Sequence, residues 1–416
     1  MKRQIRWAIA ACALVALLTA CGGGGGGDDG TPGYVARNGK VYDADGDAVQ
    51  LRGINLFGFE TDILIPQYLD AMGWKQQIAQ VKALGFNAVR LPFVPETLYS
   101  TQRIGVDLDT FVDAELNADI IGKTPLEFLD LWMDEAQAQG LYVVLDFHSV
   151  AKGVLAPLWY SDDAADYAED GAAPTYNYLP YSAEDWIRDL VLVATRYSDH
   201  DRFVGLDLYN EPHDLARWGD GDPAYVAAAD WKLAAERAAA AVLTANPNLL
   251  VFVQGIYLNN DGIEDSTLGV NFGENLQPQR YRPLAIPDDK LVLFPHTYGP
   301  DALYDFPKAS FSDPAFPANL AADWDTLFGR FAPTPPIVLG QTVILGEFGG
   351  YYGTGPSGER DVLWHDALVD YLIAKDMRSA FYWCYTPNSD GTGGILDDDL
   401  AVREDKMAML RRLFGI

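Results

Sequence analysis

Basic residues are scarce in this sequence of 416 residues. Lysine and arginine number 30 against 59 aspartates and glutamates, which gives a formal net charge of −29 at pH 7. A field of this single sign repels phosphate groups and argues against nucleic acid as a partner. The aromatic share of 12% suits a neutral, flat-faced ligand such as a sugar, because ring stacking needs no opposite charge.

Cysteine is scarcer still, with only Cys12, Cys21 and Cys384 in the whole chain. We expect the first to leave with a signal peptide and the second to carry lipid, so Cys384 has no partner within the chain. A disulfide framework is therefore not expected. Hydrophobic residues make up 49% of the sequence, so a large apolar core can supply the stability instead.

The N-terminal segment has the features of an export signal. Basic residues precede an apolar run, Trp7–Leu18, that is too short to span a membrane. The run ends in Leu18-Thr19-Ala20-Cys21, which resembles a bacterial lipobox and implies cleavage before Cys21 and lipidation of that cysteine. We expect a signal peptide at 1–20 and a glycine-rich tether at 21–33. The alternative is a plain signal peptide followed by a disordered N-terminus.

An exported protein follows from this interpretation, anchored by lipid to the bacterial membrane or cell surface or released to the medium. Gly22 after the lipidated cysteine resembles Gram-negative lipoproteins of the outer membrane. There is no second apolar run of spanning length, so the expected membrane contact is an anchor only.

Residues 34–416 show no linker or repeat and alternate between short apolar runs and amphipathic segments, which is typical of a parallel sheet with helices between its strands. Eight runs predict a single domain with the (β/α)8 TIM barrel fold. The predicted strands are Leu51–Asn55, Ala88–Phe93, Tyr142–His148, Val204–Asn210, Leu249–Gln254, Leu291–His296, Val343–Glu347 and Ala380–Tyr385.

Apolar residues at three- and four-residue spacing predict the helices. These are Leu126–Gln139, Ala183–Tyr197, Ala224–Ala245, Arg360–Ala374 and Glu404–Phe414. An N-terminal β-hairpin, Tyr34–Val49, is expected to precede the barrel. Its turn, Asp45-Gly46-Asp47, lacks the later glycine and glutamate of a calcium loop, so we interpret it as an ordinary turn.

Two glutamates follow apolar strands and would lie on the face of the barrel where catalytic groups gather. Strand four closes with Asn210-Glu211-Pro212-His213, and strand seven closes with Gly346-Glu347-Phe348-Gly349. Two carboxyl groups facing each other across a barrel mouth are what glycoside hydrolysis requires, one as an acid and one as a nucleophile or base. Each glutamate alone could instead be a charge that favours a helix N-terminus.

Further polar and aromatic residues are predicted at the same face. Arg90 could keep a neighbouring carboxylate ionised, and His148, His296 and Tyr298 are hydrogen-bonding side chains at strand ends. Trp383 is placed to put an indole under a sugar ring.

Together these residues resemble glycoside hydrolase family 5, in particular its bacterial endo-β-1,4-glucanase (cellulase) branch. The resemblance extends over nearly all of Gly39–Ile416 and rests on the strand-end residues in order. Longer stretches point to the cellulase branch: Leu51-Arg52-Gly53-Ile54-Asn55, Phe57-Gly58-Phe59-Glu60-Thr61, Asn210-Glu211-Pro212-His213-Asp214 and Gly391-Thr392-Gly393-Gly394-Ile395-Leu396.

The resemblance implies a role for each matched residue. Glu211 would be the general acid/base and Glu347 the nucleophile, with retention at the anomeric carbon and no cofactor or metal. Asn210 would bind the sugar 2-hydroxyl. Tyr298 would donate to the nucleophile and His296 would support the acid/base. Arg90 and His148 would order the site, and retention predicts carboxyl groups roughly 5–5.5 Å apart rather than about 6.5–9.5 Å.

The walls of the substrate cleft depart from that branch. Leu56 stands where related cellulases often carry tryptophan, and the stretch Thr267–Asn275 has Phe272 where we expect a richer tryptophan cluster. We expect the long segment Ala151–Tyr181 to compensate, with Trp159 among its stacking rings, and Trp218 is a similar candidate. Asp146 and Asp207 lie inside strands, upstream of the residues that reach the site, so we interpret them as buried acceptors for arginine or histidine.

Three alternatives stay open. The same retaining chemistry could act on mannan, xyloglucan or mixed-linkage glucan. A metal-dependent hydrolase could use His148, His296 and an acidic ligand, and activity that survives exhaustive chelation would exclude it. A non-catalytic surface lipoprotein that binds glycan is the third. The expected partner is a β-glucan, and we expect a monomer.

Overall fold

The computed structural model describes residues 33–108, 112–161, 180–219, 229–257, 270–303, 307–332 and 340–416. The predicted signal peptide, residues 21–32 of the tether including Cys21, and residues 162–179 of the long segment Ala151–Tyr181 lie outside these residues. Across the described ranges, no helix has the length and apolar character needed to cross a membrane.

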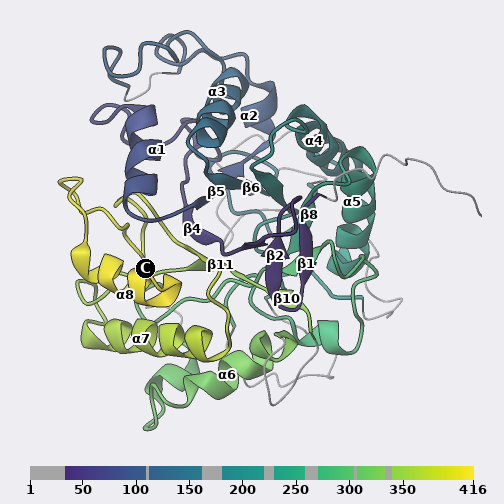
Figure 1. Ribbon diagram of the computed structural model, residues 1–416, viewed down its shortest axis with the longest axis vertical. Coiled ribbons are helices and arrows are strands. Elements are labelled where there is room, and N and C mark those ends of the chain that lie inside the picture. Colours follow the sequence, from purple (N-terminus) through teal and green to yellow (C-terminus); the bar gives the residue numbers. More distant parts are fainter. Residues whose placement is uncertain are drawn as a thin grey trace, which may run out of the picture. The chain divides into compact units, whose positions relative to one another are not determined.

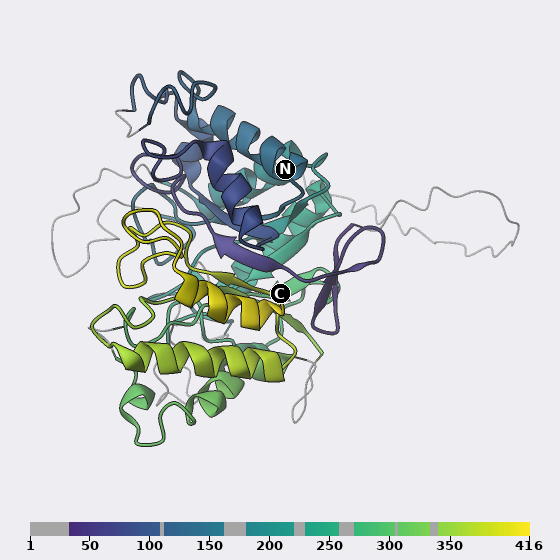
Figure 2. The ribbon, with the colours of Figure 1, turned by 60° about the vertical axis from the view of Figure 1, so that its left-hand side comes forward.

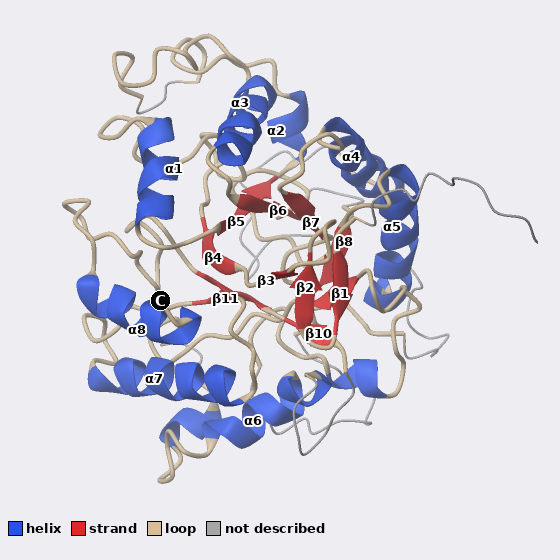
Figure 3. Ribbon diagram, in the orientation of Figure 1, coloured by secondary structure: helices blue, strands red, loops and turns tan. Residues whose placement is uncertain are grey.

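Parallel strands form the centre of the molecule (Figure 3). They are β4 (Arg52–Asn55), β5 (Ala88–Phe93), β6 (Tyr142–Phe147), β7 (Phe203–Asp207), β8 (Leu250–Val253), β9 (Leu291–Leu293), β10 (Thr342–Val343), β11 (Leu345–Phe348) and β12 (Ala380–Tyr382). Only Ile344 separates β10, which pairs with β9, from β11, which pairs with β12. These two pieces are one strand that closes the ring, so the predicted (β/α)8 barrel is confirmed.

Helices surround this barrel (Figure 1). They are α1 (Trp74–Ala83), α2 (Pro95–Tyr99), α3 (Pro125–Ala138), α4 (Ala183–Arg196), α5 (Trp231–Ala245), α6 (Leu320–Leu327), α7 (Glu359–Ala374) and α8 (Glu404–Phe414). The helix predicted from Ala224 begins at Trp231, where the Asp230 side chain caps it by accepting from the backbone N–H of Leu233. In the described residues between β8 and β9 there is only a 3₁₀ turn, Gln277–Arg280.

The predicted N-terminal hairpin is a three-stranded antiparallel sheet of β1 (Val35–Arg37), β2 (Lys40–Tyr42) and β3 (Ala48–Val49). In Figure 2 it stands at one end of the barrel. The backbone N–H of Tyr34 donates to the carbonyl of Asn248 and that of Ala36 to Asp289, both just before barrel strands. The sheet therefore covers the amino-terminal end. Asp43 accepts backbone bonds from Asp45 and Asp47, as in an ordinary turn.

The barrel interior is apolar toward the covered end. Val144, Phe252, Phe294 and Phe381 pack inside the ring together with residues of the β1–β3 sheet such as Val41. A second, larger apolar cluster lies between the strands and the surrounding helices. The polar strand-end residues are therefore left to the opposite, carboxyl-terminal face, where this fold places its chemistry.

Candidate active site

The chain continues past several strands and carries its polar residues onto the carboxyl-terminal face. β7 ends at Asp207, where the sequence predicted Asn210, but the backbone N–H of Asn210 still donates to the carbonyl of Phe147 at 3.0 Å. His296 lies beyond the end of β9 and pairs in parallel with Glu347 on β11. Strand-like backbone bonds thus fix residues that the regular ladders no longer include.

Arg90 is fully buried at the centre of the site. Its guanidinium donates at 2.9–3.0 Å to the side chains of Asp146, Asp207, Asn210 and Asn55, and it also donates to Glu347. The two aspartates are therefore the buried acceptors that the sequence predicted. A guanidinium held by fixed acceptors cannot change rotamer freely, so it holds the Glu347 carboxylate in one place.

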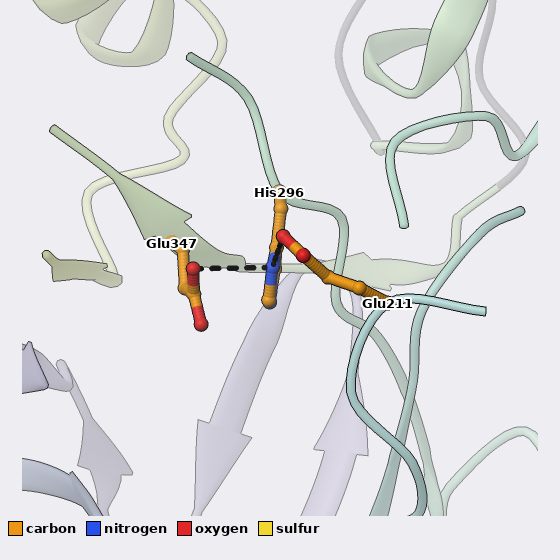
Figure 4. A group of neighbouring side chains, drawn as sticks. All are labelled: Glu211, His296 and Glu347. Atoms are coloured by element: carbon orange, nitrogen blue, oxygen red, sulfur yellow. Dashed lines mark hydrogen bonds and ion pairs between the residues drawn. The ribbon is translucent and has the colours of Figure 1, made fainter. Parts of the chain in front are cut away.

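The two glutamates lie close together on either side of His296 (Figure 4). His296 Nδ1 is 2.9 Å from a Glu211 oxygen and 3.4 Å from a Glu347 oxygen. An oxygen of Glu211 and one of Glu347 are within 4.8 Å of each other. Oxygens this close are compatible with the roughly 5–5.5 Å between the carboxyl groups of a retaining glycosidase.

Burial and neighbouring charges affect the pKa values of the two carboxyl groups differently. The pKa of Glu211 is raised well above its usual value by burial and by the neighbouring charge of Glu347. Burial also raises the pKa of Glu347, but Arg90 and the Tyr298 hydroxyl, which donates to Glu347, oppose that rise. Glu211 is thereby the proton carrier of the pair, and Glu347 is the group held as a carboxylate.

His296 is neutral at ordinary pH. Burial and the positive charges of Arg90 and His148 lower its pKa well below the usual value for histidine. A neutral imidazole has one N–H donor and one acceptor nitrogen, so it can exchange a hydrogen bond with Glu211 in either protonation state of that carboxyl. It supports the proton carrier without adding a charge.

Glu211 has an unusual backbone. Its φ angle is +51°, in the left-handed region that a residue with a Cβ rarely adopts. Its N–H donates to the Gln254 side chain at 2.8 Å, and Gln254 in turn donates to Asp207 at 2.8 Å. Gln254 therefore links the backbone of Glu211 to the acceptors that hold Arg90.

Trp383 is fixed at the edge of the site with part of its surface exposed. Its ring lies nearly parallel to those of Phe57, 5.6 Å away, and His148, 6.2 Å away. The indole N–H donates to Ser389 at 2.7 Å, and His148 Nδ1 lies 2.7 Å from Asp146. An aromatic ring held in this way can stack on a flat apolar ligand face.

Two predicted stacking residues are corrected by the structure. Trp159 is 1% exposed and packs against Trp186 and Trp231, and Trp218 is 0% exposed with its indole N–H bonded to the carbonyl of Arg282. Neither ring has a free face, so their assignment to substrate binding is wrong. Both tryptophans fill space between the strands and the surrounding segments, as large aromatic side chains most often do.

Three residues of the network were not predicted. Asn55 accepts from Arg90 and donates to the carbonyls of Gly346 and Tyr382. Gln254 supports Glu211 as described above, and Thr297 donates its backbone N–H to the Glu347 carbonyl at 3.0 Å. Each lies at or just beyond the end of a predicted strand, and that position was the signal that could have found them.

The described part of the chain does not bring together the ligand set of the metal-hydrolase alternative, His148 and His296 with an acidic residue. The one group there whose ligand atoms lie close enough for an ion is Glu211, His296 and Glu347, and His148 is not in it. His148 is instead bonded to Asp146. The glutamates are held by Arg90, Tyr298 and His296, which are hydrogen-bond donors suited to a carboxyl pair.

Known proteins resemble the chain over most of its length. Residues 42–389 match the family model described as cellulase (glycosyl hydrolase family 5). The major extracellular endoglucanase of Xanthomonas campestris pv. campestris is 43% identical over 377 residues, which are 90% of this chain and 70% of that protein. An endoglucanase of Paenibacillus polymyxa is 32% identical over 91% of this chain and 86% of its own length.

Solved structures agree with the barrel. The catalytic domain of the Xanthomonas campestris enzyme superposes with a TM-score of 0.80 at 42% identity, covering 92% of this chain and all (100%) of that one. An endocellulase from Pyrococcus horikoshii, solved with cellotetraose, superposes with a TM-score of 0.78 at 33% identity, covering 92% and 99%.

Proposed function

The chain belongs to glycosyl hydrolase family 5, the cellulase family, and we propose that it is a retaining endo-β-1,4-glucanase whose acid/base is Glu211 and whose nucleophile is Glu347. The observation that carries this assignment is the close pair of carboxyl groups, one with a strongly raised pKa and the other held by Arg90 and Tyr298. The proposed substrate is cellulose or a related soluble β-glucan, with no cofactor.

In the proposed first step, the Glu347 carboxylate attacks the anomeric carbon while Glu211 gives its proton to the departing glycosidic oxygen. A covalent glycosyl ester forms on Glu347, and the sugar that carries the glycosidic oxygen leaves as an alcohol. In the second step Glu211, now ionised, takes a proton from water, whose oxygen displaces Glu347. Two inversions at carbon give net retention.

Neighbouring residues serve both steps. The Asn210 side chain, which accepts from Arg90, would bond the sugar 2-hydroxyl, a contact that strengthens as positive charge develops on the ring. Arg90 and Tyr298 hold Glu347 before attack and receive it again as a carboxylate when the ester breaks. Trp383 is the proposed stacking surface.

The substrate class is tested by assaying the domain from Tyr34 onward on carboxymethyl-cellulose, mixed-linkage glucan, xyloglucan and mannan in parallel. We expect a rapid loss of viscosity on the cellulose derivative, because an endo-acting enzyme cuts internal bonds. Activity confined to mannan or xyloglucan would keep the mechanism and overturn the substrate. No hydrolysis of any of the four polymers would contradict the proposal and favour a role in glycan binding.

The pH dependence gives a second test, because Glu211 must be protonated when it acts as an acid. Wild-type kcat/KM should fall as pH rises through the raised pKa of Glu211. On an aryl cellobioside with an acidic phenol, Glu211→Gln should abolish that high-pH limb, since this leaving group needs no proton. Polymer hydrolysis should fall about 10²- to 10⁴-fold in the variant. A high-pH limb that survives in Glu211→Gln would assign the acid to another residue.

Export and lipid anchoring remain proposals that rest on the sequence. The relative from Xanthomonas campestris is named an extracellular enzyme, and residues 2–18 have the features of a signal peptide. We propose lipidation at Cys21, after which the tether would hold the domain, as a monomer, away from the membrane. Labelled palmitate should enter the full chain and not Cys21→Ala. Equal labelling of the wild-type chain and of Cys21→Ala would contradict lipidation at Cys21.

A further inference from the structure

Lys308 and Glu274 form a buried ion pair next to residues of the proposed site. Lys308 is 8% exposed and Glu274 is fully buried, and the ammonium group lies 2.9 Å and 2.7 Å from the two carboxylate oxygens. Neither residue touches the two proposed catalytic glutamates in any described contact. Burying two charges costs several kcal/mol of desolvation per ion, so a pair of this kind is weak as a source of stability alone.

The carboxylate of Glu274 is also bound by two groups from other segments. One oxygen accepts from the Thr297 hydroxyl at 2.7 Å, and the other accepts from the backbone N–H of Asn271 at 2.6 Å. With both contacts to Lys308, the two oxygens accept four hydrogen bonds. An uncharged glutamine at this position could accept at only one of its two terminal atoms, so the arrangement requires a carboxylate.

The two partners of Glu274, Asn271 and Thr297, are both connected to Tyr298. The Asn271 side chain accepts from the backbone N–H of Tyr298 at 3.0 Å, and Thr297 is its neighbour in the chain. Thr297 also donates its own N–H to the Glu347 carbonyl at 3.0 Å. The Tyr298 hydroxyl then donates to the Glu347 carboxylate. The ion pair is thus connected to the proposed nucleophile through the backbone and the hydroxyl of one tyrosine.

We propose that Glu274 and Lys308 are positioning residues that hold the Tyr298 hydroxyl against the Glu347 carboxylate. Lys308 neutralises Glu274, and Glu274 fixes the turn at Asn271 and the side chain of Thr297, so that Tyr298 has one backbone position. The inference rests on the proposed role of Glu347 as nucleophile. It adds a charged pair that acts on the reaction through the position of Tyr298.

A double-mutant cycle tests this connection. Lys308→Met should lower kcat on an aryl cellobioside by about 10-fold with KM little changed, because a displaced hydroxyl weakens the hold on the nucleophile. In the Tyr298→Phe background the same substitution should lower kcat less than about 2-fold, since the hydroxyl it positions is already gone. Glu274→Gln should behave like Lys308→Met in both backgrounds.

The pH profile adds a readout that a purely structural role would not move. The Tyr298 hydroxyl lowers the pKa of Glu347, so its displacement should move the acidic limb of kcat/KM to higher pH. Lys232→Met is the matched control, because Lys232 pairs with Glu236 on the outer helix α5. This control should leave the acidic limb where it is in the wild type.

Each outcome decides the inference. Equal losses of kcat in the wild-type and Tyr298→Phe backgrounds, or an acidic limb that does not move, would overturn it while the proposed function stands. If Lys308→Met does not fold, the neutral pair Glu274→Gln with Lys308→Met carries the same comparison. A wild-type chain without activity on any β-glucan would instead be a failure of the proposed function.

Discussion

Replacing Glu347 with glutamine is expected to lower kcat on carboxymethyl-cellulose by about 10⁴-fold or more. Glutamine has nearly the same shape but no negative charge, so no glycosyl ester forms and the first step of the proposed mechanism is lost. Arg90 and Tyr298 donate to different oxygens of this carboxylate, so the single amide oxygen of glutamine can still accept from one of them. The loss should therefore appear in kcat at constant fold, which reducing-sugar release and circular dichroism measure together.

Glu184→Gln is the matched control for that variant. Glu184 is an exposed glutamate on α4 that pairs with Arg237 at the surface. The control should keep the wild-type rate, because exposed ion pairs of this kind contribute little. A Glu347→Gln enzyme that retains a substantial share of wild-type activity, after contamination is excluded, would show that Glu347 is not the nucleophile.

Arg90→Met is expected to be the most destabilising single change in the described site. It removes the cation shared by Asp146, Asp207 and Glu347 and leaves these carboxylates buried without it. Breaking one side of a buried charge network costs about 3–5 kcal/mol of the free energy of unfolding. Urea denaturation at neutral pH measures this loss, and the variant should also be inactive.

The loss in free energy of unfolding that we expect for Arg90→Met should depend on pH. Burial raises the pKa of Asp207 and of Glu347, and Arg90 opposes both rises. Without the guanidinium these two pKa values are higher still in the folded state, so the contribution of the two groups to stability is present at low pH and lost as pH rises. The difference between Arg90→Met and wild type should therefore shrink on acidification. Arg196→Met, which breaks a half-exposed pair with Asp130, should cost no more than about 1 kcal/mol. Equal losses for the two variants would contradict the central role of Arg90.

The barrel could be predicted because its strands are continuous apolar runs, buried on both faces. Helix α1 was not predicted, because the polar Gln77 is one of the residues on its buried side, beside Ile78 and Val81. Helix α6 has only eight residues and a short apolar pattern. The break between β10 and β11 at Ile344 also has no local sequence signal, since the pairing of each piece depends on its neighbours in the ring.

The strand-end positions predicted most of the proposed site, because the carboxyl ends of barrel strands meet on one face. The prediction that Trp159 and Trp218 stack on substrate was wrong because both side chains are buried. Sequence composition alone does not distinguish a tryptophan that stacks on a ligand from one that packs in the core. Glu274 and Lys308 were missed for a different reason. They lie in loops after β8 and β9, and only the three-dimensional structure brings the two charges together.

The most direct test of the account is the identity of the residue that forms the glycosyl ester. A cellobioside with fluorine at C2 and a good leaving group at C1 should form an ester that hydrolyses slowly, because fluorine destabilises the positive charge of the second transition state. Mass spectrometry of the digested protein should then find the sugar on the peptide that contains Glu347. An adduct on Glu211, or turnover that inverts the anomeric carbon with no adduct at all, would contradict the proposed mechanism.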